Sequence, residues 1–270
     1  MKYEEKEARG SFDFPISYYY LDRSHLRYTM RCHWHREPEL IHVLSGTLAL
    51  TIGGEHFEGR PGDIFYVNST DLHSAIPKDC VYECTVCESA LLGEECNRLL
   101  SEYVFPIRLS GQAKVFAAHI LKALSEKPSG WKLSVRGAFQ AMFGEFLSGG
   151  GYAGRSPVRT QHSVKKAITF IEGHFTEPIT LDMLSDVCGL SPKYFERVFK
   201  EMTGKPPIRY INAYRVYKAC SQLRMTDDPV TEIAYSCGFG DLSYFIKQFK
   251  STYGLSPAAF RKIQKNIPDT

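Results

Sequence analysis

The sequence predicts an α+β protein of two domains. Three observations indicate this architecture: short apolar runs separated by turn residues in the first part of the chain, a glycine-rich stretch near residue 150, and a pattern that occurs twice in the last part. The first part is expected to form an antiparallel β-barrel with trailing helices, and the last part an all-α domain with two helix-turn-helix units. A chain of 270 residues is long enough for two domains with separate cores.

Strand signals run from about Tyr18 to Cys87. Apolar and β-branched runs alternate there with turn sequences, namely Leu44-Ser45-Gly46, Ile52-Gly53-Gly54-Glu55, Arg60-Pro61-Gly62-Asp63 and Asn68-Ser69-Thr70-Asp71. Helical periodicity follows at about 112–126 and 133–147, and these helices are expected to pack on the barrel or to form a dimer contact. The first domain is therefore set at residues 1–147.

The clearest boundary is the glycine-rich stretch from Ser148 to Pro157. It favours neither helix nor strand and has little to bury, so residues 148–163 are expected to form a linker. The second domain is set at residues 164–265.

The pattern that occurs twice lies in this second domain, at a constant offset of 50 residues. In each copy a short apolar segment leads through a glycine-containing turn into a second helix, which is typical of a helix-turn-helix unit. The matched positions are Tyr194, Phe195, Arg197, Phe199, Lys200, Gly204, Pro207 and Tyr210 in the first copy, and Tyr244, Phe245, Lys247, Phe249, Lys250, Gly254, Pro257 and Phe260 in the second.

The second helix of each copy has one apolar and one polar face. In the first copy Ser191 is the expected cap, Phe195, Val198, Phe199 and Met202 are the expected buried stripe, and Lys193, Glu196, Arg197 and Lys200 point outward. In the second copy Asp241 is the expected cap, Phe245, Phe249 and Thr252 the buried stripe, and Ser243, Ile246, Lys247 and Lys250 point outward, with Leu242 at the tip. A joining helix is expected from the Pro206–Pro207 pair to about Arg224.

The outward faces are candidates for contact with a DNA major groove. Two amphipathic helix pairs could also pack together without any ligand, but the doubling of the whole unit favours DNA, because successive major-groove faces lie about 34 Å apart. Charge agrees with this interpretation, since residues 161–270 carry 15 Lys and Arg against 11 Asp and Glu.

Composition restricts the location of the protein. No apolar run reaches a membrane-spanning length, and the first residues, Met1–Lys6, contain no apolar signal segment, so a cytoplasmic protein without membrane contact is expected. The 8 cysteines are scattered and fit a reducing compartment.

A second constellation lies among the strands. His33, His35 and Glu39 share one face of an extended strand, and His73 follows a Pro-Gly-Asp turn. Three imidazoles and a carboxylate could hold a divalent transition metal with open coordination positions. They could also line a polar pocket for a small effector.

The C-terminal pattern resembles the DNA-binding domain of the AraC/XylS family of bacterial transcription regulators. The resemblance runs from about Val164 to Gln264 and is carried by stretches that include Leu190–Phe195, Tyr210–Arg215, Ser243–Phe245 and Gly254–Pro257. It implies major-groove contacts by Lys193, Glu196 and Arg197 from the first helix, and by Leu242, Ser243, Ile246 and Lys247 from the second.

The spacing of His33, His35 and Glu39 resembles the first cupin motif, and the stretch from the Pro-Gly-Asp turn to His73 resembles a shortened second one. This second stretch departs from the motif because Pro77 and Lys78 stand where an asparagine is expected after His73. Cupin sensors of AraC-type regulators commonly keep such residues as pocket lining and bind an organic effector without metal, which is what this resemblance implies for His33, His35, Glu39 and His73.

Together these features predict a transcription regulator that is not an enzyme. A cupin-like, jelly-roll-like domain would bind a small effector such as a sugar, although no residue selects a sugar over an aromatic acid. The helices after the barrel would support a homodimer, the second domain would bind double-stranded promoter DNA, and an activator would also contact RNA polymerase. The alternative is a metal-dependent cupin enzyme, a dioxygenase or isomerase that uses His33, His35, Glu39 and His73, but it leaves the doubled pattern without a role. A third hypothesis is a barrel that only dimerises the protein.

Overall fold

The structure, a computed structural model, describes residues 14–25, 27–155 and 159–265. The chain divides into two compact units between Gln161 and His162, inside the expected linker. Residues 1–13 of the first expected domain, residues 156–158 of the linker and the C-terminal residues 266–270 lie outside the described residues. No helix among the described residues is long and apolar enough to cross a lipid bilayer.

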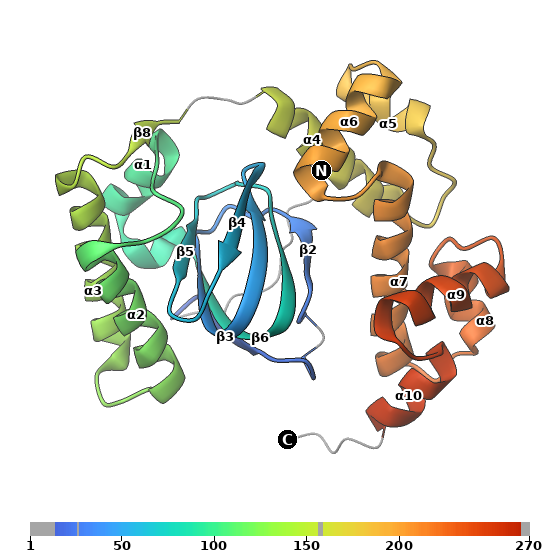
Figure 1. The fold of residues 1–270 in the computed structure, drawn as a ribbon, viewed down its shortest axis with the longest axis horizontal. Coiled ribbons are helices and arrows are strands. Elements are labelled where there is room, and N and C mark those ends of the chain that lie inside the picture. The colour runs from blue at the N-terminus through green and yellow to red at the C-terminus, as the bar shows by residue number, and fades with distance from the viewer. Residues whose placement is uncertain (1–13, 26, 156–158, 266–270) are drawn as a thin grey trace. The chain divides into compact units, whose positions relative to one another are not determined.

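The first unit is built on six antiparallel strands that form two layers (Figure 1). Two long strands belong to both layers: their first and second halves pair with different neighbours. One layer has the order β1-β6-β3-β5 and the other β2-β6-β3-β4. The strands are β1 (Ile16–Leu21), β2 (Met30–His33), β3 (Glu39–Ile52), β4 (Glu55–Gly59), β5 (Ile64–Val67) and β6 (His73–Cys87).

The bend between the layers lies where the β3–β6 register shifts, between Val43 and Thr47. Gly46 occupies this bend with a φ of 71°, and a Cβ atom there would lie 2.0 Å from the carbonyl oxygen of Asp79. Only glycine can occupy such a position, because a side chain would collide with the neighbouring main chain. The bend lets the two halves of β3 and β6 face each other, which confirms the predicted antiparallel barrel.

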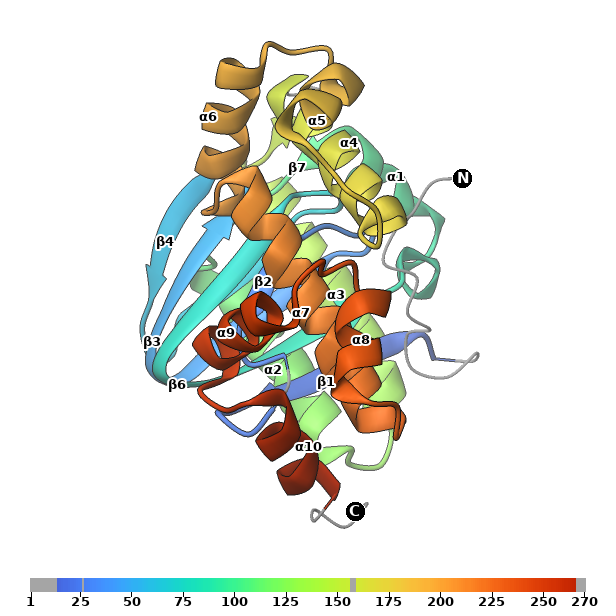
Figure 2. The same ribbon diagram turned by 90° about the vertical axis from the view of Figure 1, so that its right-hand side faces the viewer.

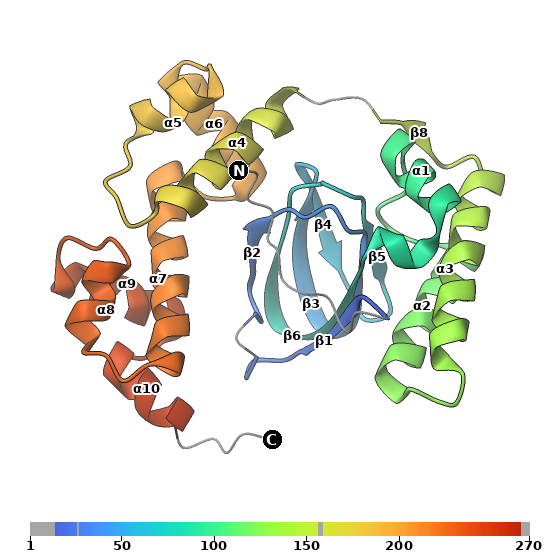
Figure 3. The same ribbon diagram turned by 180° about the vertical axis from the view of Figure 1, so that it is seen from behind.

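Helices cover the β1/β5 side of the barrel (Figure 3). They are η1 (Ser89–Leu92), α1 (Glu94–Glu102), α2 (Gly111–Glu126) and α3 (Trp131–Ser148). The sequence predicted the last two within one or two residues. One face of α3 carries an apolar stripe, Phe139, Met142, Phe143 and Phe146, which is buried in one cluster with Leu40, Ile64 and Tyr66. The first two were not predicted, because Glu94–Glu102 is short and mostly polar.

The stretch after α3 is more ordered than the predicted linker. Residues Ala153–Gly154 form β8, which pairs with β7 (Tyr103–Val104), and the Arg155 main-chain N–H donates to the Glu102 carbonyl oxygen at 2.7 Å. Helix α4 (Arg159–His174) then begins inside the expected linker, so residues 159–163 are helical. Its apolar positions, Val164, Ala167, Ile168 and Ile171, have helical spacing and are buried.

The second unit is all helical and contains two helix-turn-helix units, as predicted. Helices α5 and α6 form the first unit, α8 and α9 form the second, and α7 joins them (Figure 2). Their bounds are α5 (Leu181–Cys188), α6 (Pro192–Thr203), α7 (Pro207–Met225), α8 (Val230–Ser236), α9 (Leu242–Tyr253) and α10 (Pro257–Lys265). The turn of the second unit requires Gly238, where a Cβ atom would lie 2.4 Å from the Phe175 carbonyl oxygen.

The buried stripes of α6 and α9 differ in one respect from the prediction. All four residues expected in α6 are buried, as are Phe245 and Phe249 in α9, but Thr252 is exposed. Tyr253 takes its place, with its ring 4.8 Å from Phe249 and 5.4 Å from Phe260. The core at this end of α9 is formed by α10, which lies on the Tyr253 side of the helix.

Candidate functional site

Helix α6 presents a polar face to solvent. The predicted residues Lys193, Glu196, Arg197 and Lys200 are all exposed. The guanidinium of Arg197 lies 5.1 Å from the centre of the Tyr194 ring and donates to Glu201 Oε2 at 3.2 Å. Arg197 is thus held across the helix surface by contacts that are exposed and weak, so it can exchange them for a base edge.

Helix α9 presents an equivalent face. Ser243, Ile246, Lys247 and Lys250 are exposed, and Leu242 is half-buried. The Asp241 side chain accepts a hydrogen bond from the Tyr244 main-chain N–H at 2.6 Å, which confirms the predicted cap. The cap expected at Ser191 of α6 forms no such side-chain bond.

Helix α7 separates the two faces within one folded unit. Its 19 residues give it a length of about 28 Å. The Asn212 side chain donates to the Tyr244 hydroxyl at 3.0 Å, and Arg215 donates to the carbonyl oxygens of Phe175 and Glu177 at 2.7 Å each. The first bond ties α7 to α9, and the other two tie it to the segment between α4 and α5. The Tyr210 ring of α7 packs 5.3 Å from the Phe199 ring of α6, so the spacing between the two faces is fixed by packing rather than by a flexible connection.

Two tyrosines lie on the same faces but were not among the predicted contacts. Tyr194 and Tyr244 are each 44% exposed, which is high for aromatic residues. They occupy equivalent positions of the pattern that occurs twice, at the offset of 50 residues. An aromatic residue that recurs at an outward position could also have marked a contact surface.

The barrel brings His33, His35, Glu39 and His73 together, with one potential ligand atom from each within 4.8 Å of all the others. His35, Glu39 and His73 are almost completely buried and His33 is half-buried. His33, His35 and Glu39 do not share one strand face as expected, because β2 ends at His33 and β3 begins at Glu39, after Pro38. His35 lies in the connection between these strands, and His73 begins β6.

The three imidazole rings have the same outer contact. Nδ1 of His33, His35 and His73 lies 2.8 Å from the carbonyl oxygen of Arg31, Glu37 and Asp71, respectively. Because a carbonyl oxygen can only accept, each Nδ1 carries a proton and Nε2 is the ring nitrogen that can act as a ligand. Metal-binding histidines are typically oriented by this kind of contact.

The Glu39 carboxylate lies between two of these rings. Its Oε2 atom is 3.2 Å from His35 Nε2 and 3.0 Å from His73 Nε2, although the second contact is not aligned as a hydrogen bond. Burial opposes ionisation of Glu39, but the contacts with His35 and His73 outweigh it, so the pKa of this carboxyl lies well below its usual value. Burial likewise opposes protonation of His73, but the contact with Glu39 outweighs it and raises the pKa of His73.

The donor set fits a divalent transition metal. Three imidazole nitrogens and one carboxylate are common ligands of zinc, iron and manganese, and the ligand atoms are within reach of one ion after a small contraction. The misaligned His73 Nε2 is a buried polar atom that an ion would satisfy.

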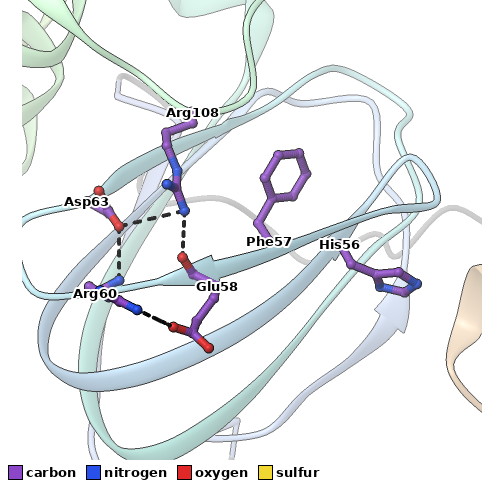
Figure 4. A pocket seen from close by; sticks show the side chains of 6 residues that line it. All are labelled: His56, Phe57, Glu58, Arg60, Asp63 and Arg108. Atoms are coloured by element: carbon purple, nitrogen blue, oxygen red, sulfur yellow. Dashed lines mark hydrogen bonds and ion pairs between the residues drawn. The ribbon is translucent and has the colours of Figure 1, made fainter.

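A separate pocket of about 690 Å³ is lined by His56, Phe57, Glu58, Arg60, Asp63 and Arg108 (Figure 4). Its two arginines already have acidic neighbours: Arg60 lies 3.1 Å from Glu58, and Arg108 lies 3.8 Å from Asp63. This wall is therefore close to neutral and offers no concentrated charge to a ligand.

The two units match two known kinds of domain. Residues 184–263 match the helix-turn-helix domain family, and residues 27–78 match the cupin domain family. The solved structure of a ligand-free single-residue variant of ToxT from Vibrio cholerae is similar over 95% of this chain and 99% of its own. Its TM-score of 0.51 at 12% identity shows a shared fold.

Relatives match along most of the chain. The uncharacterised HTH-type transcriptional regulator YdeC of Bacillus subtilis is 29% identical over 252 residues, 86% of each chain. The HTH-type transcriptional activator RhaS of Escherichia fergusonii is 26% identical over 244 residues, 85% of this chain and 87% of its own. RhaS of an Enterobacter species is 38% identical over 99 residues, 37% of this chain and 36% of its own. The chain thus resembles HTH-type transcription regulators along most of its length and has a cupin domain before its helix-turn-helix domain, as the resemblance to the AraC/XylS family predicted.

Proposed function

We propose that the protein binds a promoter site by placing α6 and α9 in successive major-groove faces of one DNA segment. The observation that carries this proposal is the equivalence of the two exposed faces, which α7 holds apart within one unit. Lys193, Glu196 and Arg197 contact base edges from α6, and Leu242, Ser243, Ile246 and Lys247 contact them from α9. Lys200 and Lys250, one turn further along each helix, contact phosphates.

The barrel senses a small effector through His35, Glu39 and His73, with His33 at the half-buried side of the cluster. The support for this role is the burial of one carboxylate and two imidazoles next to the apolar side chains of the barrel core. The same four residues would hold a divalent metal, which when bound offers open positions to oxygen atoms of an effector. Sugars and hydroxy acids both carry such oxygen atoms.

Regulation follows if effector binding changes the DNA sites that a homodimer can occupy. Helices α2 and α3 suit a contact with a second copy, because Val115 and Leu133 are 58% and 74% exposed. A protein of this kind acts in the cytoplasm, and if it is an activator it also contacts RNA polymerase. The enzyme alternative receives no support, since the relatives named above are regulators.

A salt-dependent binding titration of the full-length protein tests the DNA proposal. DNA from upstream of its own gene and of neighbouring genes is compared with scrambled DNA by fluorescence anisotropy. We expect one preferred site and a steep loss of affinity with salt. Equal affinity for all sequences would contradict specific recognition by α6 and α9.

A further inference from the structure

The loop between β5 and β6, Asn68–Leu72, touches both the histidine cluster and the end of the first unit. On the cluster side, the Thr70 main-chain N–H donates to the His35 carbonyl oxygen at 2.8 Å, and His73 Nδ1 donates to the Asp71 carbonyl oxygen at 2.8 Å. Two of the cluster's histidines are therefore attached to adjacent residues of this loop. A movement of the His73 ring around a bound ligand acts directly on Asp71, and a movement of His35 reaches Thr70 through the His35 main chain.

On its other side the loop is held by Arg155. Nη1 of Arg155 donates to the Ser69 carbonyl oxygen at 2.8 Å and to Thr70 Oγ1 at 3.2 Å. Nη2 donates to the carbonyl oxygens of Leu100 and Tyr103 at 3.2 and 3.3 Å. One guanidinium thus bridges the loop next to the cluster and the segment from α1 to β7. Because the guanidinium is charged, its hydrogen bonds are stronger than bonds between neutral groups.

Arg155 also stands at the point where the chain leaves the first unit. Its main-chain N–H is bonded to Glu102, and the residues before it, Ala153–Gly154, pair with β7. The helix that leads into the second unit, α4, begins four residues later at Arg159. Arg155 therefore fixes the point on the first unit at which the connection to the DNA-binding unit begins.

The loop shows two signs of a conformation that its surroundings impose. Thr70 has a φ of 68°, which a β-branched residue adopts only when other contacts hold it there. Arg155 Nε is buried and makes no hydrogen bond, even though both terminal nitrogens of the same group are bonded. A rearrangement that released Thr70 and shifted the guanidinium would relieve both.

We propose that Arg155 couples the histidine cluster to the connection between the two units, through the Ser69–Asp71 turn. A ligand that draws His35 and His73 together shifts this turn and changes its hydrogen bonds with the Arg155 guanidinium. The stability of the contact between residues 150–155 and the barrel changes as a result. Arg155 is a positioning residue here, since it contacts neither the ligand nor DNA. The proposal rests on the proposed sensing role of the cluster.

Hydrogen exchange of the full-length protein tests this coupling without knowledge of the effector or the operator. Exchange of peptides that cover residues 66–74 and 150–161 is measured with and without Zn²⁺, in the wild type, in Arg155→Gln and in the control Arg98→Gln. Arg98 is an exposed arginine on the neighbouring helix α1, and its side chain pairs only with Glu102 among the ion pairs that the structure shows. Titration calorimetry of the same samples measures Zn²⁺ binding.

We expect Zn²⁺ to change exchange in residues 150–161 at least about fivefold in the wild type and in Arg98→Gln, and less than about twofold in Arg155→Gln. Because coupling is reciprocal, Arg155→Gln should also change Zn²⁺ affinity, whereas Arg98→Gln should not. Equal exchange responses in the wild type and Arg155→Gln would overturn the proposal, as would a wild-type response confined to residues 66–74.

A failure of the cluster to bind metal would be seen separately, as an absence of heat on titration. In that case the cluster is perturbed by Glu39→Gln instead of by Zn²⁺. Hydrogen exchange in residues 150–161 is compared with and without Glu39→Gln, once with Arg155 present and once in the Arg155→Gln background. An effect of Glu39→Gln that disappears in the Arg155→Gln background supports the coupling. An effect that is the same in both backgrounds, or absent from both, overturns it.

Discussion

His73 Nε2 lies 3.0 Å from Oε2 of Glu39, although the two side chains come from opposite layers of the barrel. Glu39 begins β3 in the layer that contains β5, and His73 begins β6 in the layer that contains β2. The contact closes one end of the barrel with a charged pair, where the remaining interior is apolar. A buried carboxylate is costly unless it is paired, so this contact indicates a site with a use for that charge.

Glu39→Gln should lower the affinity of the cluster for Zn²⁺ by more than about 100-fold. The substitution keeps the size of the side chain but removes the negative charge that opposes the charge of the metal. Titration calorimetry of protein freed of metal by a chelator measures the change. Glu58→Gln is the matched control, because Glu58 is exposed and pairs only weakly with Arg60. Equal affinity in Glu39→Gln and the control would mean that Glu39 is not a ligand.

Metal should also stabilise the first unit and leave the second unit unchanged. Free metal at 100 times its Kd stabilises a folded state by about 2.7 kcal/mol. For a unit of this size that free energy raises the Tm by roughly 5–10 °C. Calorimetric unfolding with and without Zn²⁺, followed by chelation, resolves the shift. A shift of equal size in the transition of the second unit would point to nonspecific binding at other sites.

Arg197→Ala and Lys200→Ala should differ in their effects on DNA binding. If Arg197 contacts a guanine edge, its loss costs about 1–3 kcal/mol at the preferred site and relaxes the choice of one base pair. Lys200→Ala should weaken binding to all sequences alike and reduce the salt dependence. Anisotropy titrations against a set of single-base variants separate the two effects. If both substitutions behave identically, the faces assigned to α6 are wrong.

Local sequence signals predicted helices α5 to α9 of the second unit but not α4 or α10. Periodicity, caps and the glycine-containing turns predicted the helices, because each of these signals depends on residues only a few positions apart. The error at Thr252 arose where this local rule ends: whether Thr252 or Tyr253 is buried depends on α10, which packs on one side of α9.

Long-range contacts explain what the sequence could not show in the first unit. The spacing of His33, His35 and Glu39 marked candidate ligands, but their convergence with His73 depends on the bend of β3 and β6 at Gly46. Arg155 follows a glycine-rich stretch that resembles a linker. Its hydrogen bonds reach residues 52 to 86 positions away in the sequence, and no local pattern contains that information.

The two helix caps offer a direct comparison of local stability. Asp241→Ala removes the side-chain acceptor of the Tyr244 N–H and should lower the free energy of unfolding of the second unit by about 1 kcal/mol. Ser191→Ala should cost only a few tenths of that, because Ser191 makes no cap bond at the equivalent position of α6. Urea unfolding of both variants measures the difference. A similar loss for both would mean that Ser191 caps α6 in solution.

Gly46→Ala tests whether the bend in β3 assembles the histidine cluster. A Cβ atom at residue 46 would lie 2.0 Å from the Asp79 carbonyl oxygen, and the φ of 71° is unfavourable for alanine. We expect a loss of more than about 2 kcal/mol in the stability of the first unit, because the steric clash adds to the backbone strain. Gly62→Ala is the control: Gly62 also has a positive φ, of 89°, but no atom lies within 4 Å of its added Cβ.

Gly62→Ala should therefore lower the stability of the first unit only through backbone strain, by about 1–2 kcal/mol. Metal affinity distinguishes the two variants further. Gly46→Ala should weaken Zn²⁺ binding as well as stability, since the bend is what brings Glu39 of one layer against His73 of the other. Gly62→Ala should leave Zn²⁺ binding unchanged. A Gly46→Ala protein that is destabilised but binds Zn²⁺ normally would show that the cluster assembles independently of the bend.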